Sequence, residues 1–179
     1  ADRSPGLYLI TVNNGERSFT YWRDTSAARL LADDPEHLRQ HCTAADVIHF
    51  SGITLGILTV NAAQNLFNAL GEARARGAEV SFDNNYRPRL WRGRTDAGKL
   101  FAEAARLSTI VFPGLEDEET VFGSCTADGV AQRYLSAGAK LVVVKDGAHG
   151  AIVYDGTTRT PIPAATPRAV VDTSAAGDS

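Results

Sequence analysis

The chain has no long apolar run and little excess of either charge. No stretch of its 179 residues approaches the roughly 18 apolar residues that a membrane-spanning helix requires. The 18 Lys and Arg residues against 21 Asp and Glu residues leave a formal charge of −3. A slightly acidic chain has no general affinity for nucleic acid or acidic membranes. We therefore expect neither nucleic acid nor a membrane among its partners.

Cysteine is also scarce. Cys42 and Cys125 lie far apart and belong to no CxxC or Cys/His cluster. Their number alone permits a disulfide, but cytosolic proteins seldom keep one, so we expect two free thiols in a cytoplasmic protein. His37 and His41 have the i, i+4 spacing of one helix face. No third ligand candidate is near, and we expect surface residues rather than a zinc site.

The N-terminal residues lack both an initiator Met and the apolar region of a signal peptide. We interpret the chain as one that is entered midway. Its length nevertheless falls within the size of one domain. The apolar share of 44% is average for a globular protein, so a real core is expected.

The order of β-like and helix-like segments predicts the fold class. Residues 7–12 and 18–22 are β-rich runs around the turn residues 13–16, which predicts a hairpin within residues 1–24. From residue 25 to 179 the two kinds of segment alternate, which predicts an α/β domain with a mostly parallel sheet and helices on both faces. Strands are expected at 46–50, 79–83, 109–112, 141–145 and, after a glycine turn, 151–154, and helices at 35–41, 59–76, 96–107, 116–122 and 126–137. The turn at 51–52 is expected to lead into the second of these helices.

Ligands of such sheets bind beyond the carboxyl ends of the strands, and the end of the chain is one candidate place. The small residues Ala175, Ala176 and Gly177 stand directly before Asp178, where a helix should begin. Their bare N–H groups can receive an anion, and Asp178 can take the proton of an attacking hydroxyl. An ordinary helix start with a small turn before it explains the same residues.

Two further segments place guanidinium groups near this edge. Arg87, in the polar run after the strand at 79–83, can grip a carboxylate or phosphate, whereas Arg89 and Arg92 are expected on the surface. At the end of the hairpin, Tyr21 and Arg23 point to one side and can meet one substrate. Two exposed residues on a sheet edge would give the same pattern.

The last two candidates are a glycine turn and an acidic run. Lys145, Gly147 and Gly150 follow a strand, where glycine allows the close approach of a ring or a phosphate. A plain tight turn is the alternative. The acidic residues 116–119 can hold a metal ion directly or through water. A solvated first helical turn, which suits the helix dipole, is the alternative there.

Together these residues resemble the ribokinase-like, or phosphofructokinase-B, family of sugar kinases. The terminal Asp172-Thr-Ser-Ala-Ala-Gly-Asp178 is similar to the second signature of that family. Residues 5–8, 15–17, 21–23, 51–55, 82–91 and 144–147 are similar to the subgroup that acts on 2-keto-3-deoxygluconate. The resemblance runs along the whole chain. Members have roughly 300 residues, near the upper size of one domain, so it implies that N-terminal strands and C-terminal helices are lacking here.

The resemblance implies transfer of the γ-phosphoryl group of ATP to the 6-hydroxyl of 2-keto-3-deoxygluconate, with Mg²⁺ as a second cofactor. Asp178 matches the catalytic base of the family. Ala175, Ala176 and Gly177 match its anion hole. The alternatives are a related kinase acting on fructose or another keto sugar, and an inactive fragment or sugar-acid-binding module.

Further positions match by the same resemblance. Those matching contacts to the sugar acid are Tyr8, Tyr21, Arg23 and Arg87, and those in the nucleotide loop are Lys145, Gly147 and Gly150. Asp117 matches the Glu of an Asn-x-x-Glu motif tied to magnesium, although Gly114 stands where many members have the Asn. The hairpin matches part of a lid over the substrate. In this family the lid often forms a dimer contact, so we expect a homo-oligomer.

Overall fold

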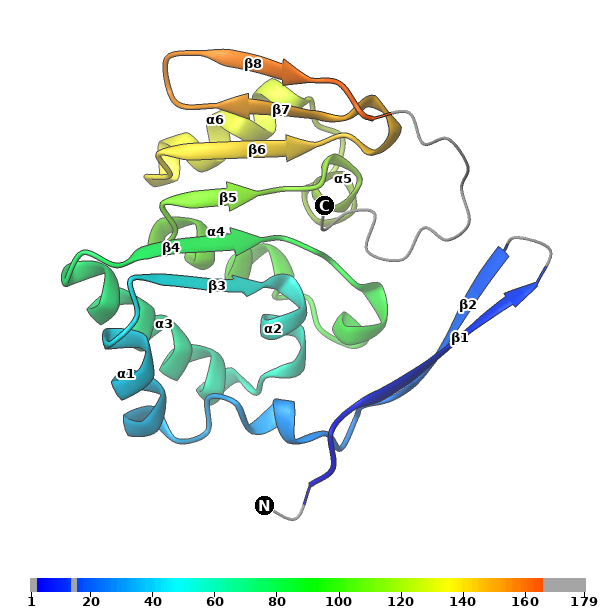
Figure 1. Ribbon diagram of the computed structural model, residues 1–179, viewed down its shortest axis with the longest axis vertical. Helices are drawn as coiled ribbons and strands as arrows, with labels where there is room; N and C mark the ends of the chain where they lie inside the picture. The colour runs from blue at the N-terminus through cyan, green and yellow to red at the C-terminus, as the bar shows by residue number, and fades with distance from the viewer. Residues whose placement is uncertain (1–2, 14–15, 166–179) are drawn as a thin grey trace.

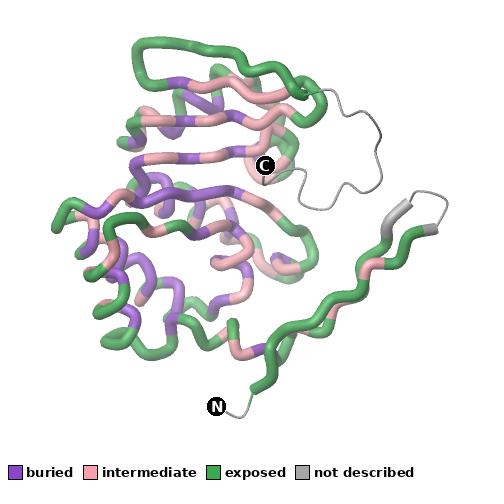
Figure 2. Tube along the Cα trace, viewed as in Figure 1, coloured by how far each residue is buried: buried purple, intermediate pink, exposed green. Residues whose placement is uncertain are grey.

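A six-stranded sheet flanked by helices forms the body of the molecule, and a two-stranded hairpin forms a separate sheet (Figure 1). The computed structural model describes residues 3–13 and 16–165. The hairpin consists of β1 (Leu7–Asn13) and β2 (Glu16–Trp22), with Tyr8 opposite Tyr21 in antiparallel register. The hairpin expected from the sequence is therefore confirmed. Its described residues are exposed along almost all of their length (Figure 2).

The order of strands in the sheet is β3-β4-β5-β6-β7-β8. Strands β3 to β6 are mutually parallel and β7 runs antiparallel to both of its neighbours, β6 and β8, so the expected mostly parallel sheet is confirmed. The strands are β3 (Val47–Ser51), β4 (Glu79–Asp83), β5 (Ile110–Phe112), β6 (Leu141–Lys145), β7 (Ala151–Tyr154) and β8 (Arg159–Ile162). The short β8 has no counterpart in the sequence prediction, because the Pro within Arg-Thr-Pro-Ile marks an edge strand that pattern reading demotes.

The α-helices other than α2 begin and end close to the predicted residues. They are α1 (Pro35–Thr43), α2 (Gly52–Ile57), α3 (Val60–Ala75), α4 (Ala97–Leu107), α5 (Leu115–Phe122) and α6 (Ala127–Ala137). Three 3₁₀ turns complete the set: η1 (Ala27–Leu30), η2 (Pro88–Trp91) and η3 (Gly147–His149). The side chain of Asp34 caps α1 by accepting from the backbone N–H groups of Glu36 and His37 at 3.1 and 3.0 Å.

Helix α2 corrects the sequence prediction, which gave only a turn after β3. Ser51 caps this helix, and its backbone N–H donates to the hydroxyl of Thr54 at 3.3 Å. Gly52 is required there, since a Cβ atom would lie 1.9 Å from the carbonyl oxygen of Asn84. Close packing of α2 against the loop after β4 therefore explains a glycine that the sequence made look like a turn residue.

The core lies between the sheet and the helices. Helices α3, α4 and α6 lie along one face of the sheet (Figure 1), and Phe82, Phe101, Val111 and Val142 are fully buried. Along β6 burial alternates, so that Val142 is buried and its neighbour Val143 is half-buried. The rings of Phe82 and Phe101 meet edge to face with centroids 5.4 Å apart, which fixes α4 on β4.

The cysteines and the His37–His41 pair lie where the sequence suggested. Cys42 is buried, Cys125 is half-buried, and both are free thiols, as expected. His37 and His41 are exposed, with ring centroids 4.5 Å apart. Within residues 3–13 and 16–165 no three His, Cys, Asp or Glu side chains are grouped to hold a metal ion. No helix among those residues is long and apolar enough to cross a membrane.

Candidate active site

The carboxyl ends of the parallel strands bring a carboxylate and an ammonium group together. Asp83 is the last residue of β4 and Lys145 the last of β6, and β5 between them ends at Phe112. The Lys145 Nζ atom lies 2.6 Å from Asp83 Oδ2. The two side chains are 28% and 12% exposed, so the pair can still be reached by a ligand. Lys145 was predicted to bind nucleotide, and here it already neutralises a carboxylate.

The turn after β4 is held by its own side chains. The backbone N–H of Asn85 donates to Asp83 Oδ1 at 3.0 Å and to Asn84 Oδ1 at 2.8 Å. Among the described residues other than glycine, Asn85 is the one with positive φ, at 28°. This conformation is costly and persists where the surroundings determine it fully, as happens at binding loops.

Asp117 reaches the same loop from the first turn of α5. Its Oδ2 atom accepts from the backbone N–H of Tyr86 at 3.0 Å. Burial raises the pKa of the Asp117 carboxyl, while this hydrogen bond and the charges of Arg87 and Lys145 oppose the change. Arg87 itself is exposed, and its guanidinium donates to the carbonyl oxygen of Tyr86 at 2.9 Å. The structure thus brings Asp117, Arg87 and Lys145 to one edge of the sheet.

The hairpin supplies a second group of predicted residues. The Arg23 guanidinium lies 4.2 Å from the centre of the Tyr21 ring, so the two side chains do share one side. Arg89, which lies in η2 and is exposed as expected, stacks on the same ring at 5.3 Å. Tyr8 lies across the hairpin, with its ring centre 6.3 Å from that of Tyr21. Tyr21 therefore joins the hairpin to the loop after β4.

The glycine turn after β6 has a structural explanation. Gly147 and Gly150 have positive φ values of 50° and 96°. A Cβ atom on Gly150 would lie 2.1 Å from the carbonyl oxygen of Ile162, at the end of β8. The close approach that the sequence suggested is, in the described residues, an approach of the chain's own backbone. The turn stays at the same sheet edge as Lys145.

A buried polar network beside this loop was missed from the sequence. Of the acidic run, Glu116 and Glu119 are exposed, as a solvated first turn should be, but Glu118 is 0% exposed. Its Oε1 atom accepts from Asn84 Nδ2 at 3.0 Å and from the Tyr134 hydroxyl at 2.6 Å. Pattern reading treated the run as one solvated surface, and only a helical-wheel position facing α6 distinguishes Glu118.

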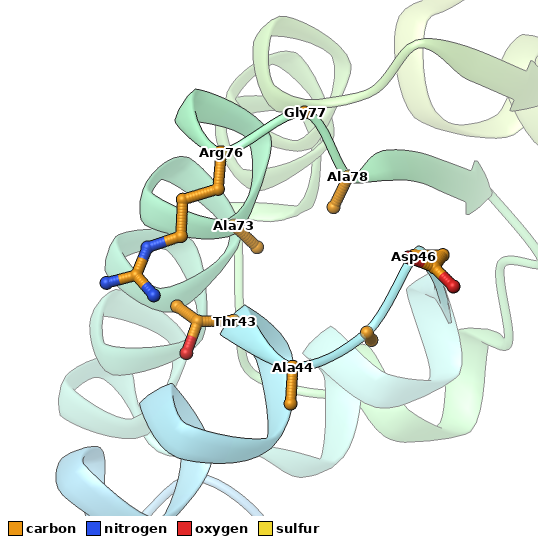
Figure 3. A pocket seen from close by; sticks show the side chains of 8 residues that line it. Thr43, Ala44, Asp46, Ala73, Arg76, Gly77 and Ala78 are labelled. Carbon is orange, nitrogen blue, oxygen red and sulfur yellow. The ribbon is translucent and has the colours of Figure 1, made fainter.

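These residues form one unit at the edge of the sheet. We call it the strand-end cluster, and it consists of Asp83, Asn84, Asp117, Glu118 and Lys145. The predicted catalytic residues Asp178, Gly177, Ala176 and Ala175 lie outside the described residues. A hollow at the opposite edge is lined by small residues, Asp46 and Arg76 near the amino ends of β3 and β4 (Figure 3). It contains none of the predicted site residues.

The sequence of the whole chain identifies the class of protein. Residues 1–179 match the sequence model of the pfkB family of carbohydrate kinases, and the chain belongs to that family. It is 38% identical over 184 residues to 2-dehydro-3-deoxygluconokinase of Escherichia coli K12, covering 99% of this chain and 60% of that protein. The enzyme of the same name from Dickeya dadantii is 39% identical, covering 99% of this chain and 59% of that protein. The chain thus spans about three fifths of the length of these relatives.

Solved structures agree with the fold. A fructokinase from Xylella fastidiosa with bound ATP superposes with a TM-score of 0.81 at 28% identity, covering 98% of this chain and 54% of that chain. A PfkB protein from Polaromonas sp. JS666 superposes with a TM-score of 0.76 at 30% identity, covering 92% of this chain and 55% of that chain. The ribokinase-like architecture expected from the sequence is confirmed.

Proposed function

We propose that the full-length protein containing this chain is an ATP-dependent carbohydrate kinase that phosphorylates 2-keto-3-deoxygluconate at its 6-hydroxyl. One observation favours an acidic substrate over a neutral sugar. Arg23 and Arg89 both stack on Tyr21, next to the loop that ends in Arg87. The two guanidinium groups on that ring repel one another, and a carboxylate between them offsets that repulsion. The relatives named 2-dehydro-3-deoxygluconokinase support the same substrate.

In the proposed reaction the 6-hydroxyl oxygen attacks the γ-phosphorus of ATP. The new O–P bond forms as the bond to the bridging oxygen breaks, so ADP leaves and phosphate stays on the sugar acid. Asp178 accepts the proton of the attacking hydroxyl. The backbone N–H groups of Ala175, Ala176 and Gly177 stabilise the charge that develops on the transferred group.

Sugar and nucleotide are proposed to meet at the carboxyl ends of the strands. Tyr8, Tyr21, Arg23 and Arg87 contact the sugar acid. Lys145, Gly147 and Gly150 lie by the nucleotide. Lys145 exchanges part of its interaction with Asp83 for a phosphate oxygen, which its 28% exposure permits.

Mg²⁺ is proposed to enter with ATP. Such ions bind through one or two carboxylates together with waters and substrate phosphates, so a single half-buried carboxylate is a sufficient protein ligand. Asp117 fits, because only its Oδ2 atom is engaged by the Tyr86 N–H in the described contacts. The ion neutralises charge on the phosphates. The chain's own groups, Asp117 and Lys145, orient them.

The hairpin is proposed to act both as a lid and as a contact with a second copy of the chain. One of its faces carries Tyr21, which stacks with Arg89, and the other carries Leu7, Leu9 and Trp22, which are 61, 54 and 56% exposed. An isolated two-stranded hairpin is at best marginally stable in water. Burial of this second face against the same face of another copy removes that apolar surface from water.

Steady-state assays on the full-length protein test the proposal. ADP production should be at least about 100-fold more efficient with 2-keto-3-deoxygluconate than with fructose, because the neutral sugar leaves the arginines unpaired. Asp178→Asn should lower kcat by about 100- to 10,000-fold, the usual worth of a general base. Equal efficiency with fructose would favour a fructokinase-like enzyme. Undiminished turnover of Asp178→Asn would exclude that residue as the base.

A further inference from the structure

Glu118 is a carboxylate in the protein interior with no exposed surface at all. Glutamate is almost never fully buried unless it is paired, because removing its charge from water is costly. It lies on α5 directly after Asp117, with its side chain toward α6 and the loop after β4. A buried Glu118 carboxylate therefore needs hydrogen-bond donors, and the identity of those donors indicates the role of the residue.

Three donors satisfy the Glu118 carboxylate. The Tyr134 hydroxyl and Asn84 Nδ2 donate to Oε1 at 2.6 and 3.0 Å, and the Arg133 guanidinium donates to Oε2. Burial raises the pKa of the Glu118 carboxyl, whereas the bonds from Tyr134 and Asn84 and the Arg133 charge oppose that change. Burial and the neighbouring carboxylate raise the pKa of the Tyr134 phenol well above its usual value, so Tyr134 remains a donor.

Asn84 links this carboxylate to two backbone turns. Its side chain is also fully buried. Asn84 Oδ1 accepts from the backbone N–H groups of Gly114 at 2.9 Å and Asn85 at 2.8 Å. A carboxamide has one acceptor oxygen and one donor nitrogen. The Glu118 carboxylate requires the nitrogen on its side, and the two backbone N–H groups require the oxygen on theirs, so both select one orientation of the Asn84 amide. The amide cannot flip without facing donors with donors.

The two turns carry the residues assigned to the substrate. Gly114 is the N-cap of α5, whose first turn places Asp117 against the Tyr86 N–H. Asn85 has its strained φ of 28° two residues before Arg87. Hydrogen bonds that end at Glu118 therefore act, together with those from Asn85 to Asp83 and from Tyr86 to Asp117, on the loop that carries Arg87.

We infer that Asn84 and Glu118 are a pair of positioning residues that hold the loop from Asp83 to Arg87 against α5 and so present Arg87 to the acidic group of the substrate. The identity of that substrate rests on the proposed function. The hold on the loop rests on the hydrogen bonds alone.

A reciprocal exchange of charge and amide tests the pair in the full-length protein. Asn84→Asp puts a second carboxylate about 3 Å from Glu118, where two like charges repel strongly. Glu118→Gln alone should be mild, because one oxygen can still accept from Asn84 and Tyr134 while Arg133, 38% exposed, turns to water. The double variant Asn84→Asp/Glu118→Gln restores one donor against one acceptor. Tyr134→Phe is the matched control, since it removes one bond to Glu118 without touching Asn84.

Amide hydrogen exchange gives a readout that does not depend on activity. Asn84→Asp should speed exchange of the Gly114 and Tyr86 amides by at least about tenfold, with the strand amides of Val111 and Val142 unchanged. The double variant should return within about threefold of the wild type, because residues in direct contact are coupled and the pair regains one donor against one acceptor. Unchanged exchange at Gly114 in Asn84→Asp, or equal acceleration at every amide, would overturn the inference.

Steady-state kinetics gives the second readout. Asn84→Asp should raise KM for the sugar acid by about tenfold with KM for ATP unchanged, and the double variant should recover it. Tyr134→Phe should lower Tm but change neither KM by more than about twofold. If both KM values changed equally and followed Tm across all the variants, the role of Asn84 and Glu118 would be purely structural.

The two readouts fail separately. A wild-type protein inactive on the sugar acid would refute the proposed function, while the exchange rates would still decide whether the pair holds the loop. If Asn84→Asp does not fold, a folded double variant with wild-type exchange at Gly114 supports the pair. A double variant as unfolded as the single one contradicts it.

Discussion

The strand-end cluster and the hairpin differ in how far the chain satisfies its own groups. In the cluster, Asn84 and Glu118 are fully buried and each has hydrogen-bond partners within the chain. The described part of the hairpin is mostly exposed (Figure 2), and its Leu7, Leu9 and Trp22 are each more than half exposed. The cluster is therefore ordered by the α/β body. The hairpin leaves apolar side chains for a substrate or a second copy of the chain to cover. This suits a lid and a contact surface.

Truncation of one phenylalanine in each region should separate them most clearly. Phe82→Ala removes a fully buried ring from β4 and should lower the free energy of unfolding by about 3–5 kcal/mol. Phe19→Ala, in the hairpin, removes a ring that is 36% exposed and should cost less than about 2 kcal/mol. Denaturant unfolding of the full-length protein measures both. Similar losses would mean that the hairpin is as well packed as the sheet.

Gly52→Ala should have the next largest effect on stability, because it disrupts the packing of α2 against the loop after β4. The new Cβ atom would lie 1.9 Å from the carbonyl oxygen of Asn84, and the backbone must move. We expect a loss of about 1–3 kcal/mol, the usual cost of overpacking. Gly71→Ala in α3 is the control, since its nearest neighbour would be 3.8 Å away and alanine favours a helix. A Gly52→Ala protein with wild-type Tm would contradict the close packing of α2.

Leu9→Ser should act on association rather than on folding. Leu9 is 54% exposed, so its loss should change the free energy of unfolding of a monomer by about 0.5 kcal/mol or less. If the hairpin joins two copies, the dissociation constant should rise about tenfold or more, which sedimentation measures. Val60→Ser, 74% exposed on α3, is the matched control and should leave association unchanged. A dimer unaffected by Leu9→Ser would place its interface elsewhere.

Asp117→Asn should give the smallest effect, one that depends on pH. Burial raises the pKa of the Asp117 carboxyl above its ordinary value of 3.8, so the ionised form is disfavoured in the folded protein. That penalty is complete above the raised pKa and disappears as the pH falls below 3.8. Asparagine should therefore raise Tm at pH 7 and lose this advantage near pH 3.5. A stabilisation that grows toward low pH would have the wrong sign.

Periodicity and turn residues were enough to predict the hairpin, the parallel strands and most helices. Segments such as Leu141–Lys145 and Val60–Ala75 contain their own signal, since burial on a sheet or a helix face repeats along the chain. Helix α2 and strand β8 escaped because the signals conflict locally. Gly52 reads as a turn residue, and the Pro at 161 reads as a strand breaker, until their neighbours are known.

The candidate site was only partly predictable for a similar reason. Polar groups beside predicted strand ends or helix starts stand out in the sequence, and these are Tyr21, Arg23, Arg87, Asp117 and Lys145. Their individual roles in binding remain predictions. Asn84 and Glu118 did not stand out, because a buried polar residue looks like a surface residue in one sequence. Only the fold distinguishes them, because it brings two residues that are 34 positions apart in the sequence into a 3.0 Å hydrogen bond.

By itself the sequence determined the class of fold, the family and the edge of the sheet at which to search, because those depend on local pattern and on residue types. The tertiary structure alone decided which charges meet. It paired Lys145 with Asp83, stacked Arg23 and Arg89 on one phenol, and buried Glu118 against Asn84. Such pairings depend on how parallel strands and their loops align across the sheet. Side-chain partners distant along the chain are fixed only when the backbone has closed around them.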